Sequence, residues 1–203
     1  VTITDSNGNV VETQTPTVDA NGDWTFDAAQ LAEGTYTVEA TAVDNGGNTS
    51  TPASVSFTID VTAPSVTLDA PADNSTLTDN TPTVSGTAEA GSTVTVEIKD
   101  SNGAVIETQT PTVDANGDWT FDAAQLADGS YSVEVTATDA AGNNATAGPN
   151  SFTVDTVDPV FTFDTPADNS VTNDNTPTIS GTAEPGANVD VRILDSNGNE
   201  VQT

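Results

Sequence analysis

The 203-residue chain contains no cysteine, histidine or methionine, and its only basic side chains are Lys99 and Arg192. The lack of cysteine excludes disulfide bonds and thiolate metal sites. Without histidine or cysteine a serine nucleophile needs another base, and no Ser-Lys arrangement is visible around Lys99. The acidic residues lie in predicted turns or on outward strand faces, and a glycine-rich phosphate loop is absent. We therefore expect that the chain is not an enzyme.

Positive charge is scarce, whereas 31 acidic side chains give a formal net charge of −29. Such a surface repels nucleic acid, because Lys and Arg are what neutralise phosphates, and it repels anionic membranes. No apolar run approaches the roughly 20 residues that span a bilayer. The composition excludes nucleic-acid binding and membrane insertion, and it favours cations as partners. The start at Val1, without an initiator methionine or signal sequence, indicates an excerpt of a longer protein.

The most informative feature that is present is an internal repeat. The segment Glu12–Ala32 recurs unchanged as Glu107–Ala127, at an offset of 95 residues that holds along the whole chain. A unit of this length is a domain by itself. We expect 1–60 to be the C-terminal part of one repeat, 61–155 a complete repeat, and 156–203 the N-terminal part of another. The two partial repeats are expected to fray unless they pair with each other, within a molecule or between molecules.

Within 61–155, apolar and polar residues alternate with a period of two, which predicts half-buried strands. The apolar positions are Val66, Leu68, Val84, Val94, Val96, Ile98, Trp119, Phe121, Tyr131, Val133, Val135, Ala137, Phe152 and Val154. Asn102-Gly103 and Asn116-Gly117 are turn signals. About seven short strands separated by such turns predict an all-β fold, with tandem immunoglobulin-like antiparallel β-sandwiches.

Two local features refine this prediction. Leu126–Tyr131 is typical of a tyrosine corner, in which a tyrosine hydroxyl bonds back to the preceding crossover. Asp122–Leu126 is compatible with a helical turn. We interpret the Trp and Tyr side chains as core residues and not as a ligand platform.

Several motifs together resemble the bacterial immunoglobulin-like repeats of large, repetitive, type 1-secreted (RTX-type) surface adhesins. They are Asp79–Gly91 with its copy Asp174–Gly186, Gly117–Trp119, Leu126–Tyr131, Ala137–Asn143 and Asp60–Pro64. The resemblance covers the whole chain. It implies a structural stalk at the bacterial cell surface, outside the cell, in which Ca²⁺ at the domain junctions stiffens the array. It also implies that neighbouring repeats are the immediate partners and that domains outside this chain bind the host or surface ligand.

Immunoglobulin topology places the end of the last strand of one repeat beside two loops of the next. At the first junction this gathers Asp60, Glu89, Asp139 and Asn143 as candidate Ca²⁺ ligands. At the second junction the matching residues are Asp155 and Glu184, with Asp158 in the linker where the first junction has Ala63. Ca²⁺ takes about six to eight oxygen ligands, and the calcium sites of extracellular modules are weak, with dissociation constants of about 10⁻⁴ to 10⁻³ M. Asp and Asn also cap turns as ordinary solvated residues, so that alternative stays open.

The stalk hypothesis has three competitors. The repeats could bind host or matrix glycans or proteins directly, although their loops are small and polar and the segment Glu12–Ala32 is copied intact. They could be spacer domains of a large secreted hydrolase. The excess of acidic residues could also be an adaptation to a saline habitat, where salt screens self-repulsion.

Overall fold

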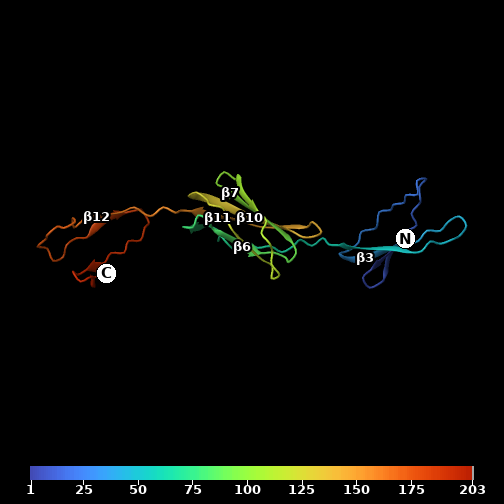
Figure 1. The fold of residues 1–203 in the computed structure, drawn as a ribbon, viewed down its shortest axis with the longest axis horizontal. Helices are drawn as coiled ribbons and strands as arrows, with labels where there is room; N and C mark the ends of the chain where they lie inside the picture. The colour runs from blue at the N-terminus through green and yellow to red at the C-terminus, as the bar shows by residue number, and fades with distance from the viewer. Residues whose placement is uncertain (203) are drawn as a thin grey trace. The chain divides into compact units, whose positions relative to one another are not determined.

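A computed structural model describes residues 1–202 of the chain, and within that range every regular element is a β-strand. The chain divides into two compact units, Val1–Val154 and the residues from Asp155 onward. The first unit holds a four-stranded sheet near the N-terminus and a complete two-layered repeat (Figure 1).

The complete repeat has two facing layers. The larger is a five-stranded sheet in the order β5-β11-β10-β7-β8, with bounds Ser75–Leu77, Asn144–Val154, Gly129–Thr138, Thr93–Asp100 and Val105–Gln109. In the other layer β6 (Thr83–Thr87) pairs with β9 (Asp118–Asp122). Bridges from Val66 to Ala88 and from Ala70 to Ser85 add the preceding segment to the open side of β6. β5 runs parallel to β11, and every other paired strand in this repeat is antiparallel.

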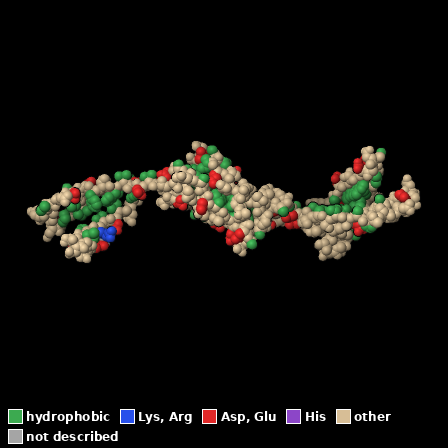
Figure 2. Space-filling view, in the orientation of Figure 1, with side chains coloured by type: hydrophobic (Ala, Val, Ile, Leu, Met, Phe, Trp, Pro, Cys, Tyr) green, Lys and Arg blue, Asp and Glu red, His purple; other side chains and the backbone are tan. Residues whose placement is uncertain are grey.

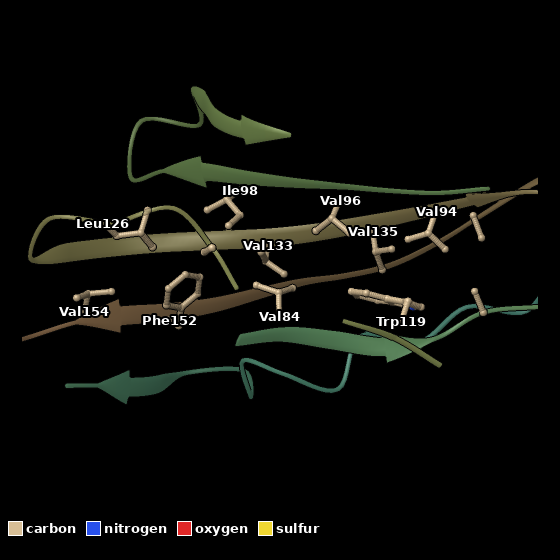
Figure 3. Packing of buried hydrophobic residues seen from close by; sticks show 13 residues of the cluster. Val84, Val94, Val96, Ile98, Trp119, Leu126, Val133, Val135, Phe152 and Val154 are labelled. Atoms are coloured by element: carbon tan, nitrogen blue, oxygen red, sulfur yellow. The ribbon is translucent and has the colours of Figure 1, made fainter. Parts of the chain in front are cut away.

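The core lies between these layers because alternate residues of each strand face inward. Val94, Val96 and Ile98 of β7 are at most 1% exposed. Their neighbours in the same sheet, Val133 and Val135 of β10, are fully buried. Trp119 of β9 and Phe152 of β11 fill the space between the layers (Figure 3). The predicted all-β, immunoglobulin-like sandwich is confirmed, as is the assignment of Trp119 to the core.

The N-terminal region forms one sheet. Its order is β2-β1-β3-β4, with bounds Val10–Thr13, Thr2–Asp5, Gly34–Ala40 and Ala53–Ile59. These strands correspond to β8, β7, β10 and β11 of the complete repeat, 95 residues further on. Among the residues described up to Asp60, no second sheet faces this one.

The second unit contains two short hairpins. β12 (Phe161–Thr165) pairs with β13 (Ser180–Ala183), and β14 (Ile193–Leu194) pairs with β15 (Glu200–Gln202). β13 occupies the sequence position of β6, and β14–β15 occupies that of the β7–β8 hairpin. Every residue of β12 is exposed.

The predicted tyrosine corner is present. The prediction of a helical turn at Asp122–Leu126 is wrong, because this stretch forms no turn. The hydroxyl of Tyr131 donates to the carbonyl of Ala127 at 2.9 Å, and Tyr36 makes the same bond to Ala32 in the first repeat. The backbone N–H groups of Ala123 and Leu126 donate to residues 82 and 80, at 3.0 and 2.8 Å. Because these donors are already used by another segment, the stretch stays extended instead of closing a helical turn.

Candidate functional site at the junction of two repeats

The first linker begins at Asp60, an exposed residue that directly follows β4. Oδ1 of Asp60 accepts a hydrogen bond from the backbone N–H of Thr62 at 3.1 Å. The hydroxyl of Thr62 donates to both carboxylate oxygens of Glu33, at 3.0 and 2.9 Å. Glu33 lies in the corner before β3, so the preceding repeat holds the start of the linker.

The loop between β10 and β11 carries Asp139 and Asn143. Oδ1 of Asp139 accepts the backbone N–H groups of Ala141, Gly142 and Asn143 at 2.8–2.9 Å. Its Oδ2 accepts from Nδ2 of Asn143 at 2.9 Å. The side chain of Asn143, followed by the backbone donors, holds the pKa of Asp139 below its ordinary value. The ionised carboxylate therefore orders this loop.

One amide connects the loop to the linker. Nδ2 of Asn143 also donates to the backbone carbonyl of Asp60 at 3.1 Å. The structure thus brings together three of the predicted site residues, Asp60, Asp139 and Asn143. Between the corner that holds Glu33 and the loop that holds Asn143, the linker is held from both sides.

The turn chemistry of Asp139 is not specific to the junction. The same pattern, a carboxylate that accepts the backbone N–H groups two and four residues later, recurs at Asp5, Asp19, Asp44, Asp100, Asp114 and Asp195. These hydrogen bonds lower the pKa of each of these carboxyl groups as well. What distinguishes the Asp139 loop is the bond from Asn143 to Asp60.

The other predicted ligands are more dispersed. The backbone N–H of Glu89 donates to residue 65 at 3.0 Å, and its side chain is exposed. In the second unit, Oδ1 of Asp155 accepts the N–H of residue 157 at 3.2 Å, Asp158 is exposed, and the N–H of Glu184 donates to residue 160 at 3.1 Å. Nowhere in residues 1–202 do three acidic side chains lie close enough to hold a metal ion together. Glu89 is therefore not part of one carboxylate cluster with Asp60 and Asp139.

The donor chemistry at the first junction fits a hard cation in part. In the structure, Asn143 presents its NH₂ group to the carbonyl of Asp60 and to Oδ2 of Asp139. Rotation of this amide by about 180° exchanges its nitrogen and oxygen, which places an amide oxygen beside the carbonyl of Asp60 and Oδ2 of Asp139. Backbone carbonyl, carboxylate and amide oxygens are the ligand types that Ca²⁺ prefers.

Sequence reasoning missed Glu33 as a junction residue. Gly34 pairs with Ile59 at the end of β4, so the corner before β3 lies beside Asp60. The tyrosine corner was the signal that could have located it, because this corner fixes where the crossover before β3 runs. At the second junction the residue at the same repeat position is Asp128.

Two antiparallel layers, a parallel β5–β11 edge and a tyrosine corner define an immunoglobulin-like sandwich. The family model of the bacterial Ig-like domain matches residues 1–61 and again 62–156. The chain therefore belongs to the bacterial Ig-like domain family, as the sequence motifs predicted.

Solved structures with similar folds come from several contexts. A tetra-tandem repeat from the extending region of a large adhesion protein shares 30% identity over 98% of this chain, with a TM-score of 0.43, and this chain spans 53% of that one. CopC from Methylosinus trichosporium OB3b shares 25% identity over 45% of this chain and 94% of its own, with a TM-score of 0.37. The fibronectin(III)-like modules of CbhA from Clostridium thermocellum share 19% identity over 75% of each chain, with a TM-score of 0.41.

With TM-scores below 0.5, these likenesses do not extend the family assignment. A comparison with curated protein sequences finds no match. Within residues 1–202, there is no helix of the length and hydropathy needed to cross a lipid bilayer.

Proposed function

We propose that the chain is a non-catalytic stalk segment of a bacterial cell-surface adhesin, which holds a binding domain away from the cell. The observation that carries this proposal is the repetition of one Ig-like domain at an offset of 95 residues, with Glu12–Ala32 copied unchanged as Glu107–Ala127. Repetition of one module adds length to a protein while each module contacts only its neighbours. In this role the protein is extracellular, and domains outside this chain bind the adhesion target.

The distribution of side chains in the complete repeat supports a spacer over a binding module. Trp119 and Phe152 are 2% exposed and belong to the core, and the partly buried Phe121 and Tyr131 pack against it. The loops at Asp100–Gly103 and Asp139–Asn143 are small and polar, and their Asp side chains are used in ordering the loops themselves. Recognition surfaces are typically enriched in exposed aromatic residues, and these loops offer none.

We further propose that Ca²⁺ stiffens the junctions. The candidate ligands at the first junction are Asp60, Asp139 and Asn143, together with Glu89 from the loop between β6 and β7. Asp155, Asp158 and Glu184 are the candidates at the second. The support is the contact from Asn143 to Asp60 and the oxygen-rich chemistry of the residues around it. A cation shared by two repeats removes hinge freedom, because it binds the linker and the following loop at once.

The test is a distance measurement between two repeats. The chain has no cysteine, so Ser54→Cys on β4 and Thr108→Cys on β8 provide clean sites for spin labels, both at exposed positions. We expect a broad distance distribution in EDTA and a narrow one in about 1 mM CaCl₂, but not in matched MgCl₂ or NaCl. Equally broad distributions in every condition would contradict the stiff stalk.

Thermal unfolding provides a second readout of the same ions. A ligand that binds only the native state raises the melting temperature, so a rise specific to Ca²⁺ is expected. A rise of the same size in NaCl with EDTA would instead identify screening of the acidic surface as the cause.

A further inference from the structure

The segment that enters the complete repeat is bonded to both of its layers. Residues 65–70 run beside β6, where the backbone N–H groups of Thr67 and Asp69 each donate to a β6 carbonyl at 2.8 Å. The chain then crosses to the other layer and forms β5, which pairs with β11 in the parallel direction (Figure 3). We call residues 65–77 the entry segment. It ties the first layer to the last strand of the second.

Two side chains fasten the crossover of the entry segment to β11. Oδ1 of Asp73 accepts a hydrogen bond from the backbone N–H of Ser151 at 2.8 Å. The backbone N–H of Asn74 donates to the carbonyl of the same residue at 2.6 Å. Nδ2 of Asn150 donates to the carbonyl of Pro71 at 2.9 Å. The crossover is therefore held at these points in addition to the strand pairing that follows.

A β-bulge turns the Asn150 side chain toward the crossover. Asn150 pairs with Val133 and Ala147 pairs with Val135, so β11 has one residue more than β10 between these two pairs. A Cβ atom at Gly148 would lie 2.8 Å from the carbonyl of Val133, and glycine permits this close approach. Since Val133 is fully buried, its partner Asn150 lies on the side of the sheet that faces the core.

The direction of these strands decides how the repeat meets a pull on its two ends. The chain reaches the entry segment from the linker that begins at Asp60, and it leaves the repeat after Val154, the last residue of β11. Because β5 and β11 are parallel, tension pulls the entry segment backward and β11 forward along one axis. The evenly spaced hydrogen bonds of a parallel pair then share the load. Strands that are pulled apart from one end lose their bonds one at a time instead.

We infer that the entry segment and β11 form a latch that keeps the complete repeat folded when the chain is pulled from both ends. The inference rests on the proposed function, because a stalk transmits a pull on its terminal domain through each repeat in series. While the latch holds, the tension passes from the entry segment into β11 without unravelling the strands between them.

The latch varies along the sequence. Asp73 and Asn74 recur 95 residues later as Asp168 and Asn169, whereas the residue 95 positions before Asn150 is Val55, which has no amide. Asn150→Val therefore introduces the residue of the neighbouring repeat, and it removes the bond to the crossover while keeping the rest of the strand.

The test holds the full-length chain at constant force in two geometries, in EDTA so that no cation at the junction contributes. In the first geometry, handles are attached to the two chain ends. In the second, an exposed Thr78→Cys directly after β5 replaces the N-terminal handle. Thr78 and Val154 follow parallel strands to the same end, so the second geometry unzips these strands. Unfolding of the repeat is recognised by the release of about 75–90 residues, or roughly 250–300 Å of chain.

We expect the folded repeat to last at least about ten-fold longer at the same force when it is pulled from the chain ends. Equal lifetimes in the two geometries overturn the latch. The spin-label distances test the stiff stalk separately, so the latch and the stalk can fail independently of each other.

Two variants locate the latch in the first geometry. Asp73→Ala removes the acceptor for the N–H of Ser151, and Asn150→Val removes the donor to the carbonyl of Pro71. Each is expected to shorten the lifetime by about five- to ten-fold, because a bond that breaks at the moment of rupture changes the unfolding rate in full. Lifetimes equal to that of the parent chain in both variants overturn the proposal.

The matched control is Asp114→Ala. Figure 2 shows acidic side chains spread over the complete repeat, so the loss of any one carboxylate also relieves repulsion. Like Asp73, Asp114 is exposed and accepts backbone N–H groups, but it lies in the turn before β9, away from the entry segment. Its lifetime under force is expected to stay within about two-fold of the parent value, because bonds still intact at rupture leave the rate unchanged. Equal shortening by Asp73→Ala and Asp114→Ala overturns the latch.

Discussion

The segments Glu12–Ala32 and Glu107–Ala127 have identical sequences and different structures. In the second copy, Asp118–Asp122 forms β9 against β6, and Trp119 is 2% exposed. In the first copy the same five residues, 23–27, form no strand, and Trp24 is 48% exposed. The strand therefore forms because a partner strand, β6, pairs with it. The β-propensity of these five residues is not enough to form the strand by itself, because ordering their backbone costs about 1–2 kcal/mol per residue.

The features that the two segments share are the local ones. In both copies the turn Asp bonds the N–H groups two and four residues later. In both, a glutamate carboxylate, Glu12 or Glu107, accepts the N–H 17 residues later at 2.9 Å. Interactions within the same half of the repeat therefore form without the other half, whereas the cross-layer contacts do not.

Replacing the tryptophan in each copy gives the largest expected contrast. Trp119→Ala removes a fully packed core side chain and is expected to cost about 3–5 kcal/mol of unfolding free energy. Trp24→Ala removes a half-exposed ring that stacks on Phe26 and is expected to cost less than about 1 kcal/mol. Urea unfolding followed by circular dichroism measures both. Equal losses of stability would show that Trp24 is packed in solution.

Gly22 and Gly117 close the same turn in the two copies and differ in their surroundings. Gly22 and Gly117 have φ of 93° and 91°, so Ala at either position is strained by about 1–2 kcal/mol. Around Gly22 the space is open, whereas a Cβ atom at Gly117 would lie 2.6 Å from the carbonyl of Ala88. Gly117→Ala is therefore expected to cost about 1–3 kcal/mol more than Gly22→Ala, measured by the same unfolding experiment. Identical costs would mean that backbone strain alone governs the turn.

The same contrast explains what could be predicted from the sequence. Alternating Val94, Val96 and Ile98 identified a strand because half-burial leaves a periodic pattern. The turns and the tyrosine corner were predictable because their chemistry is local. β5 was missed, since Ser75–Leu77 is short and has no clear alternation, and its position depends on parallel pairing with β11. The exposure of Trp24 was equally unpredictable from a sequence identical to that around Trp119.

At the candidate site, the sequence identified polar residues but not their contacts. Asp60 and Asn143 were placed at one junction by topology, and the structure joins them with a hydrogen bond. The bond from Thr62 to Glu33 was not predicted, because it links residues 29 positions apart whose proximity depends on how β3 and β4 pair. The assignment of these residues as Ca²⁺ ligands stays a prediction.

A comparison of Asn143 with its copy Asn48 distinguishes the effect of the bond to the linker from the effect of the bond within the turn. Both side chains donate to the turn carboxylate, Asp139 or Asp44, at 2.9 Å, and Asn143 also reaches Asp60. Asn143→Ala is expected to cost about 1 kcal/mol and, in CaCl₂, to broaden the spin-label distance distribution between residues 54 and 108. Asn48→Ala should leave that distribution unchanged. Broadening by both variants, or by neither, would show that the Asn143–Asp60 bond does not restrain the linker.

The smallest expected difference concerns acid pH, and it again contrasts Asp139 with its copy Asp44. Hydrogen bonds, led by the one from the Asn143 or Asn48 side chain, lower the pKa of each carboxyl group in the folded protein. A lowered folded pKa stabilises the protein above the unfolded value of about 3.9, and this stability is lost as pH falls through the folded pKa.

Replacement by asparagine keeps an acceptor oxygen but removes this titration. Thermal unfolding of Asp139→Asn is therefore expected to depend less on pH below about 4 than that of the parent chain. Asp44→Asn should reduce the pH dependence of the N-terminal sheet alone, because the Asp44 loop makes no bond equivalent to the one between Asn143 and Asp60. The effects are small because both carboxylates are near solvent, where screening weakens them. If Asp139→Asn loses stability with acid as steeply as the parent chain, carboxylates other than Asp139 dominate the acid transition.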